Sequence, residues 1–126
     1  MPPASISVAN SERVPAVAIR RIAENWELTE DETAGLLGTD VSTMRELLDT
    51  RGGEELSDEI LKRIGTVIAI WENVVSLFGT GQIGQGWMTR PNADFGNVAP
   101  IRRMTSGSLA DLAEIREYLD SARRTP

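Results

Sequence analysis

The 126-residue chain has no cysteine and no histidine. Without cysteine it cannot form a disulfide or a zinc finger or carry out thiol chemistry. Without histidine it lacks the commonest general base and the commonest transition-metal ligand, so an enzyme would depend on carboxylates, hydroxyls or Lys62. No paired acids in a loop setting support such chemistry. We therefore expect no catalytic residue, no metal and no cofactor, and a protein that acts by binding.

Long apolar runs are also missing. No stretch approaches the length of a membrane span, and the N-terminus lacks the basic start and apolar middle of a signal peptide. The chain is 40% hydrophobic and 25% charged, which is typical of soluble globular proteins, and it is long enough for a real core. These features predict a cytoplasmic protein without membrane contact.

Charge is distributed unevenly along the chain, whose net charge is −6. Residues 1–80 carry fourteen acidic and seven basic side chains, a net charge of −7, whereas residues 81–126 carry five and six, a net charge of +1. An acidic first part opposes general affinity for nucleic acid. The two parts are therefore expected to serve different electrostatic roles.

The first part of the chain is predicted to be helical after a short tail. Residues 1–13 are rich in Pro, Ala, Ser and Asn without helical periodicity, which predicts a flexible tail. A helical apolar pattern begins at Val14. The N-caps predicted for later helices are Thr29, Asp40, Ser57 and Ser108.

The second and third predicted helices form a helix-turn-helix pattern. Gly38 permits the positive φ of the turn, and Leu37, Met44 and Leu47 fill the wedge between the helices. To read DNA, the third helix must expose donors to bases and cations to phosphates, yet residues 29–50 carry a net charge of −5. The motif is therefore either a packing scaffold or a DNA reader. The candidate DNA-binding residues are Ser42, Thr43, Arg45 and Arg51.

The longest helix is predicted to follow the Ser57 cap, and its apolar surface is wider than one face of a small domain needs. One side is expected to pack on the first three helices, while the other meets a second copy of the chain or the C-terminal segment. A fully enclosed central helix is the alternative. The candidate dimer or core residues are Ile64, Val67, Trp71, Val74 and Phe78.

Glycines mark the expected boundary between two domains. Gly79 is predicted to cap the long helix and to close a domain of residues 14–79. Residues 80–86 are then a glycine-rich linker, and residues 87–126 form a second, small helical domain. Residues 79–84 match the glycine spacing of dinucleotide-binding loops, but they follow a helix where such a loop follows a strand, so no nucleotide site is predicted.

Residues 85–100 predict an ordered loop. Its two aromatic side chains, Trp87 and Phe95, would lose entropy unless each is buried or covered by a partner. Trp87 is expected to anchor the small domain internally, and Phe95 to face a partner. Arg102 and Arg103 follow this loop, and positive charge beside aromatic residues is typical of interfaces.

The order of these parts resembles the Xre/MbcA/ParS antitoxin family over about residues 14–122. The resemblance is most specific between Trp87 and Gly107, where Trp87-Met88-x-x-Pro91-Asn92 is followed by Pro100 and by a glycine before the closing amphipathic helix. It implies an all-α fold, with a helix-turn-helix-like four-helix N-terminal domain and a small helical C-terminal toxin-binding domain.

The resemblance also implies partners. Such an antitoxin binds a cognate toxin, usually a RES-domain enzyme that consumes NAD, and covers its active-site entrance. The N-terminal region dimerises and in some members binds promoter DNA, so a homodimer is expected, with DNA bound alone or only with the toxin. The alternative function is a helix-turn-helix transcriptional regulator. The resemblance gives toxin-binding roles to Trp87, Arg90, Pro91, Asn92, Phe95 and Pro100, and the charge argument adds Arg102 and Arg103.

Overall fold

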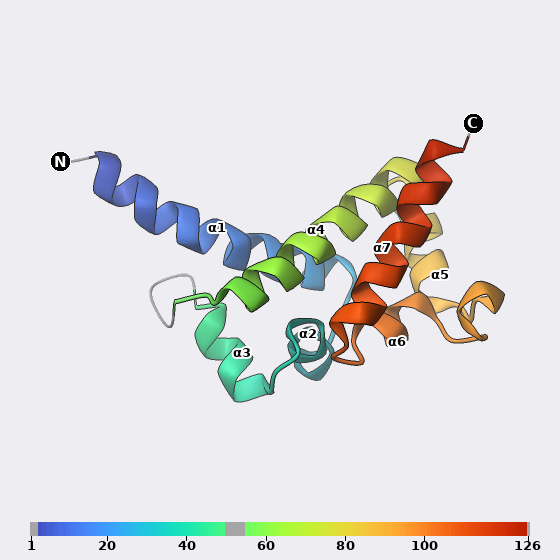
Figure 1. The fold of residues 1–126 in the computed structure, drawn as a ribbon, viewed down its shortest axis with the longest axis horizontal. Helices are drawn as coiled ribbons and strands as arrows, with labels where there is room; N and C mark the ends of the chain where they lie inside the picture. Colours follow the sequence, from blue (N-terminus) through green and yellow to red (C-terminus); the bar gives the residue numbers. More distant parts are fainter. Residues whose placement is uncertain (1–2, 50–54, 126) are drawn as a thin grey trace.

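Figure 1 shows the computed structural model, which describes residues 3–49 and 55–125, with side chains described from residue 14 onward. The described residues contain no strand, only one isolated antiparallel bridge between Asn92 and Val98. The fold class is therefore all-α, as predicted. The helices are α1 (Pro3–Asn25), α2 (Glu30–Leu37), α3 (Val41–Leu47), α4 (Asp58–Phe78), α5 (Gln82–Thr89), the short 3-10 helix η1 (Ala93–Phe95), α6 (Pro100–Met104) and α7 (Leu109–Arg124).

The predicted N-caps are confirmed. The Thr29 hydroxyl accepts the Glu32 amide at 3.1 Å, and the Glu32 carboxylate accepts the Thr29 amide at 2.8 Å, which completes a capping box. The side chains of Asp40, Ser57 and Ser108 each accept the backbone N–H three positions later. Such caps satisfy donors that a helix start leaves unpaired, so they define where α2, α3, α4 and α7 begin.

Helix α1 begins earlier than the sequence indicates. It starts at Pro3, so residues 3–13 are helical, whereas the sequence shows helical periodicity only from Val14. The flexibility of residues 1–13 stays a prediction. Proline fits the first position of a helix. A stripe of apolar residues indicates that one side of a helix is buried, so its absence does not exclude a helix. In Figure 1 the N-terminal half of α1 extends away from the other helices. A helical segment outside the core has no need of the apolar pattern on which the prediction relied.

Helices α2 and α3 pack as the predicted helix-turn-helix. Gly38 ends α2 with a φ of 68°, in the left-handed region that favours glycine. Leu37, Met44 and Leu47 are at most 5% exposed, so they fill the wedge between the two helices as expected. Helix α3 ends at Leu47, so the turn after it begins within the described residues.

Helix α4 runs through the middle of the molecule and contacts α1, α2, α5 and α7. Ile64, Val67 and Val74 are at most 3% exposed, while Trp71 and Phe78 are half-buried. The sequence analysis left open what covers the second apolar side of this helix. The C-terminal segment covers it, because α7 packs along α4. One hydrophobic core therefore contains residues from both parts of the chain.

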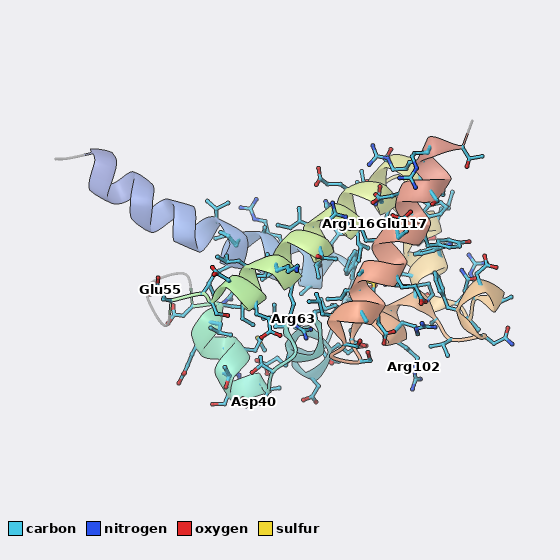
Figure 2. The ribbon with its side chains drawn as sticks, in the orientation of Figure 1. Asp40, Glu55, Arg63, Arg102, Arg116 and Glu117 are labelled. Carbon is cyan, nitrogen blue, oxygen red and sulfur yellow. The ribbon has the colours of Figure 1, made fainter. Side chains whose placement is uncertain are left out.

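Arg63 joins the two parts within this core. It is 7% exposed, and its guanidinium donates to the Gly107 carbonyl at 2.9 Å, in the turn before α7. It also donates to the Leu36 carbonyl at 3.5 Å, near the end of α2. Figure 2 shows the Arg63 side chain among the sticks between α4 and α2. One buried cation thus satisfies carbonyl groups of both segments.

Replacing Arg63 by methionine is expected to lower the free energy of unfolding by about 2 kcal/mol, because two carbonyls lose their donor. Lys62 is the matched control, since it is exposed and its ammonium has no partner among the described residues. Lys62→Met should leave the stability nearly unchanged. Urea unfolding measures both variants, and an equal loss of stability in the two would contradict this role of Arg63.

Candidate functional site

The C-terminal part of the chain exposes apolar side chains on α5. Ile83 is 69% exposed, the highest value of any large hydrophobic residue in the described part of the chain. Trp87 lies one helical turn later on the same side and is half-buried. These side chains border an open hollow of about 350 Å³, which we call the α5 hollow. Its lining residues are Phe78, Ile83, Trp87, Arg90, Pro91 and Asn92.

Helix α5 occupies a segment for which the sequence predicts a linker and a loop. It includes most of residues 80–86 and the start of residues 85–100. Glycine disfavours a helix, but Gly84 is buried, and a Cβ atom there would lie 3.0 Å from the Val74 side chain. Close packing on α4 therefore supports α5 despite its glycines. As a result, Trp87 stands on a helix and not in a loop.

Four aromatic rings pack together beside the α5 hollow, and two of them, Phe78 and Trp87, line it. The Trp87 ring is stacked with Phe78 at a centroid distance of 5.7 Å and with Tyr118 at 6.1 Å. Phe95 meets Tyr118 edge-on at 4.9 Å and Trp87 edge-on at 6.4 Å. Such pairs stabilise one another by more than their buried area alone. The cluster therefore holds Trp87 in a fixed orientation, consistent with its expected anchoring role.

The sequence predicts that Phe95 faces a partner. The Phe95 side chain is instead buried, with 3% of it exposed. The reversal after η1 explains this, because Gly96 and Asn97 have φ values of 65° and 64° and the Asn97 amide donates to the Asn92 carbonyl at 2.9 Å. This tight turn folds Phe95 against the helices. Pro100 is also buried, in the first turn of α6, a position that proline favours. Both side chains are therefore buried, although the resemblance gives them toxin-binding roles.

Tyr118, which the sequence analysis missed, ties this loop to α7. Its hydroxyl donates to the Asp94 carboxylate at 2.7 Å. This hydrogen bond, and then burial, raises the pKa of the Tyr118 phenol, so the donor stays protonated at neutral pH. Tyr118 lies between Ile115 and Leu119, two buried residues of the α7 stripe. Its position at the edge of that stripe was the only sequence signal.

The two arginines after Pro100 have different surroundings. Arg103 donates to the Glu114 carboxylate at 2.6 Å and to the Phe95 carbonyl at 3.4 Å, and its guanidinium lies 5.8 Å from the Phe95 ring. Arg102 is exposed, points away from the ribbon in Figure 2, and has no side-chain partner among the described residues. Arg103 therefore holds the loop against α7, and Arg102 is the cation available to a partner.

The candidate DNA-binding residues lie on or after α3. Ser42 is exposed and Thr43 is half-buried. Arg45 is exposed, but its guanidinium donates twice to the Glu30 carboxylate of α2, at 2.6 and 2.7 Å. The pKa of Glu30 is lowered, mainly by the hydrogen bond from Arg45. Arg51 lies outside the described residues, so in the described part of α3 the single cation is already paired.

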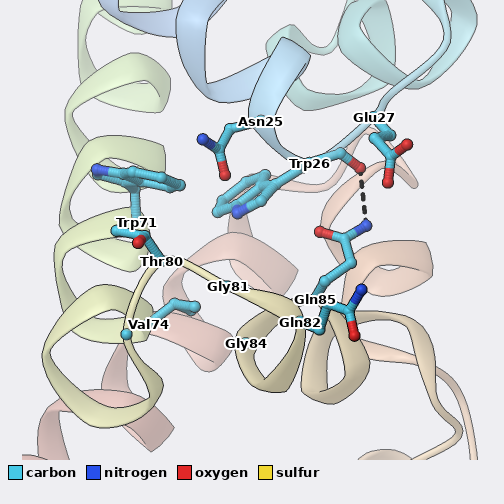
Figure 3. Close-up of a pocket in the computed structure, with 11 residues that line it drawn as sticks. Asn25, Trp26, Glu27, Trp71, Val74, Thr80, Gly81, Gln82, Gly84 and Gln85 are labelled. Carbon is cyan, nitrogen blue, oxygen red and sulfur yellow. Dashed lines mark hydrogen bonds between the residues drawn. The ribbon is translucent and has the colours of Figure 1, made fainter.

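A second hollow, of about 330 Å³, lies where α1, α4 and α5 meet (Figure 3). The rings of Trp26 and Trp71 approach to 6.1 Å, and the Gln85 amide donates to the Trp26 carbonyl at 3.1 Å. Residues of the 79–84 glycine segment complete the lining, with 79–81 between α4 and α5 and 82–84 in the first turn of α5. This segment follows α4 and not a strand, so it connects packed helices and lacks the setting of a dinucleotide-binding loop.

Two further findings limit the chemistry of the described residues. No group of three or more Asp, Glu, His or Cys side chains in them is placed to hold a metal ion. No helix within residues 3–49 and 55–125 has the length and apolar character to cross a membrane. The α5 hollow, with aromatic walls and an arginine at its rim, has the composition of a protein-binding surface.

The fold and this surface define a class of protein, a helix-turn-helix protein with a binding surface in its C-terminal part. The family model of the antitoxin Xre-like helix-turn-helix domain matches residues 7–68, and that of the antitoxin Xre/MbcA/ParS C-terminal toxin-binding domain matches residues 74–124. The chain is 31% identical to uncharacterized protein y4oB of Sinorhizobium fredii (strain NBRC 101917 / NGR234) over 117 residues, which cover 91% of this chain and 90% of that protein. The chain belongs to the Xre/MbcA/ParS antitoxin family.

Proposed function

We propose that this chain is the antitoxin of a RES-domain toxin that consumes NAD, and that it covers the entrance to the toxin's active site with the α5 hollow. The supporting observation is that the exposed Ile83 and the whole lining of the hollow lie within the residues matched by the toxin-binding domain. Exposed apolar surface of this kind is typical of an interaction site. The choice of a RES-domain partner rests on the family resemblance.

The proposed inhibition is steric and needs no chemistry from the antitoxin. The entrance is covered only while the complex exists. The degree of inhibition should therefore match the fraction of toxin molecules that have the antitoxin bound. A few anchors at the centre of the surface are expected to provide most of the affinity. The stacking of Trp87 with Phe78 and Tyr118 reduces the entropy lost on binding, because the Trp87 side chain is ordered in advance.

The test first searches the neighbouring genes for one that encodes a RES-domain enzyme, and then uses that enzyme. The purified chain is titrated into the enzyme while NAD consumption is measured. We expect consumption to fall to background once every toxin site is occupied. A stable complex that still consumes NAD would exclude covering of the active site. The absence of any complex would exclude this toxin as the partner.

We further propose that two copies of the chain pair through their N-terminal helices. Val14 of α1 is 60% exposed and Leu61 of α4 is 39% exposed. A helix is stabilised mainly by packing. The N-terminal half of α1 extends beyond the rest of the chain in Figure 1, so a second copy would provide packing for it. Sedimentation velocity should show a dimer for the wild-type chain and a monomer for Val14→Glu with Leu61→Glu. A wild-type monomer would contradict this pairing.

Promoter binding is a second candidate function, favoured by the helix-turn-helix match and by the geometry of α2 and α3. Because Glu30 occupies Arg45, we expect Glu30→Gln to strengthen binding to DNA upstream of the gene by about threefold to tenfold. The dependence of that affinity on salt should also become steeper. Glu72→Gln, at an exposed acid on α4, is the control and should bind like the wild type.

Mobility shifts at two salt concentrations, with and without the toxin, measure this effect. Equal affinity of Glu30→Gln and the wild-type chain would show that Arg45 is not a phosphate contact. DNA binding seen only in the presence of toxin would mean that the partner supplies positive charge or fixes the dimer.

A further inference from the structure

We propose that the α5 hollow recognises a toxin segment that carries an apolar side chain beside a carboxylate. The apolar side chain would enter the hollow, and the carboxylate would bind Arg90 at its rim. This inference rests on the proposed function and specifies the chemistry of the partner. It follows from the way in which one cation is held in place.

Arg90 follows directly after α5, and its side chain folds back along that helix. Its Nε donates to the Gly86 carbonyl at 3.1 Å. No other described residue forms a hydrogen bond or ion pair with the guanidinium, and Arg90 is exposed. The two terminal nitrogens therefore have no partner among the described residues. A guanidinium held in this way presents planar donors that match the two oxygens of a carboxylate.

Gly86 makes this placement of the guanidinium possible. A Cβ atom on residue 86 would lie 2.5 Å from Nη2 and 3.3 Å from Cζ of Arg90. Glycine inside a helix is less stable than alanine. Among the described residues, and apart from the backbone of α5, the one contact under 3.0 Å that a Cβ would make is with the Arg90 side chain. The structure therefore assigns Gly86 the role of positioning Arg90.

The hollow and the cation together select the partner. Phe78, Ile83, Trp87 and Pro91 give the hollow an apolar lining, which suits an aliphatic or aromatic side chain. Residues 81–126, which carry most of the hollow, have a net charge of +1, so this part of the chain does not repel an acidic segment as the first part would. Arg90 is the charged residue of the lining, so it is the group that a carboxylate would meet there. This arrangement fixes the position of the toxin segment as well as adding affinity.

The test compares variants by isothermal titration calorimetry against the RES-domain enzyme of the proposed pair. Arg90→Gln removes the charge, whereas Gly86→Ala keeps the charge but displaces the guanidinium. Both should bind about tenfold more weakly than the wild-type chain, and the deficit should shrink at high salt. Arg21→Gln, at an exposed cation of α1, is the control and should stay within about twofold.

Thermal unfolding separates this effect from folding. Gly86→Ala should unfold at the same or a higher temperature than the wild type, because alanine favours a helix. A variant that is at least as stable but binds more weakly supports a positioning role for Gly86. Wild-type affinity of Arg90→Gln would overturn the inference while leaving the proposed function intact. Failure of the wild-type chain to bind the enzyme would overturn both.

The carboxylate itself is identified from the side of the toxin. Exposed Asp and Glu residues of the enzyme are replaced one at a time by their amides. One replacement should weaken binding of the wild-type chain about tenfold but leave binding of Arg90→Gln unchanged, as expected for two residues in contact. If no replacement behaves in this way, Arg90 does not bind a carboxylate of the toxin.

Discussion

Replacing Ile83 by aspartate is expected to weaken toxin binding by at least about a hundredfold while leaving the chain folded. Ile83 is 69% exposed, so folding gains little from its side chain. It lies in the first turn of α5, where a negative charge interacts favourably with the helix dipole. In the complex, however, the same position would be covered, and an unpaired carboxylate is costly to bury. Calorimetry and circular dichroism measure the two effects separately.

The matched control for this variant is Gln82→Asp. Gln82 precedes Ile83 in the same turn and is exposed, but it lines the second hollow and not the α5 hollow. This substitution introduces the same charge at nearly the same place in the fold. It should change the affinity by less than about threefold. If Ile83→Asp binds as well as the wild-type chain, the α5 hollow is not the contact surface.

The largest loss of stability is expected from Gly35→Ala. A Cβ atom on Gly35 of α2 would lie 2.1 Å from the carbonyl oxygen of Thr105, which is backbone at the end of α6. The two segments would have to move apart, at a cost of about 3 kcal/mol. Because α2 and α6 belong to different parts of the chain, such a loss would show that these parts stabilise each other.

Gly65→Ala is the matched control for this substitution. Gly65 lies in α4, and apart from the backbone of α4 a Cβ atom there would meet no atom of the described residues within 4 Å. Alanine should therefore raise the free energy of unfolding by about 0.5–1 kcal/mol through its helix propensity. Urea unfolding of both variants gives the comparison. A Gly35→Ala chain as stable as Gly65→Ala would contradict the close contact between α2 and α6.

Local signals were sufficient for much of the fold. The caps at Thr29, Asp40, Ser57 and Ser108 depend on hydrogen bonds within four residues, so the sequence predicts them directly. The left-handed Gly38 and the wedge of the helix-turn-helix are equally local. The extent of α1 was missed because helix formation outside the core leaves no apolar pattern.

Parts of the candidate site could not be predicted because they depend on contacts between distant segments. The glycines before Trp87 indicated a linker, whereas packing of Gly84 against Val74 supports a helix there. Ile83 was therefore not recognised as an exposed neighbour of Trp87. The burial of Phe95 likewise depends on Tyr118, which is distant in sequence. The local sequence can predict which residue types belong to an interface. It cannot predict which of their side chains are exposed, because exposure depends on contacts between distant segments.

Hydrogen–deuterium exchange of the chain with and without the RES-domain enzyme tests the central proposal most directly. If the α5 hollow covers the toxin, amides in residues 82–98 should exchange more slowly in the complex, because a covered surface opens less often. Amides in α2 and α3 should change much less. Slower exchange confined to α1, α2 and α3, with residues 82–98 unchanged, would contradict the assignment of the toxin-binding surface to α5.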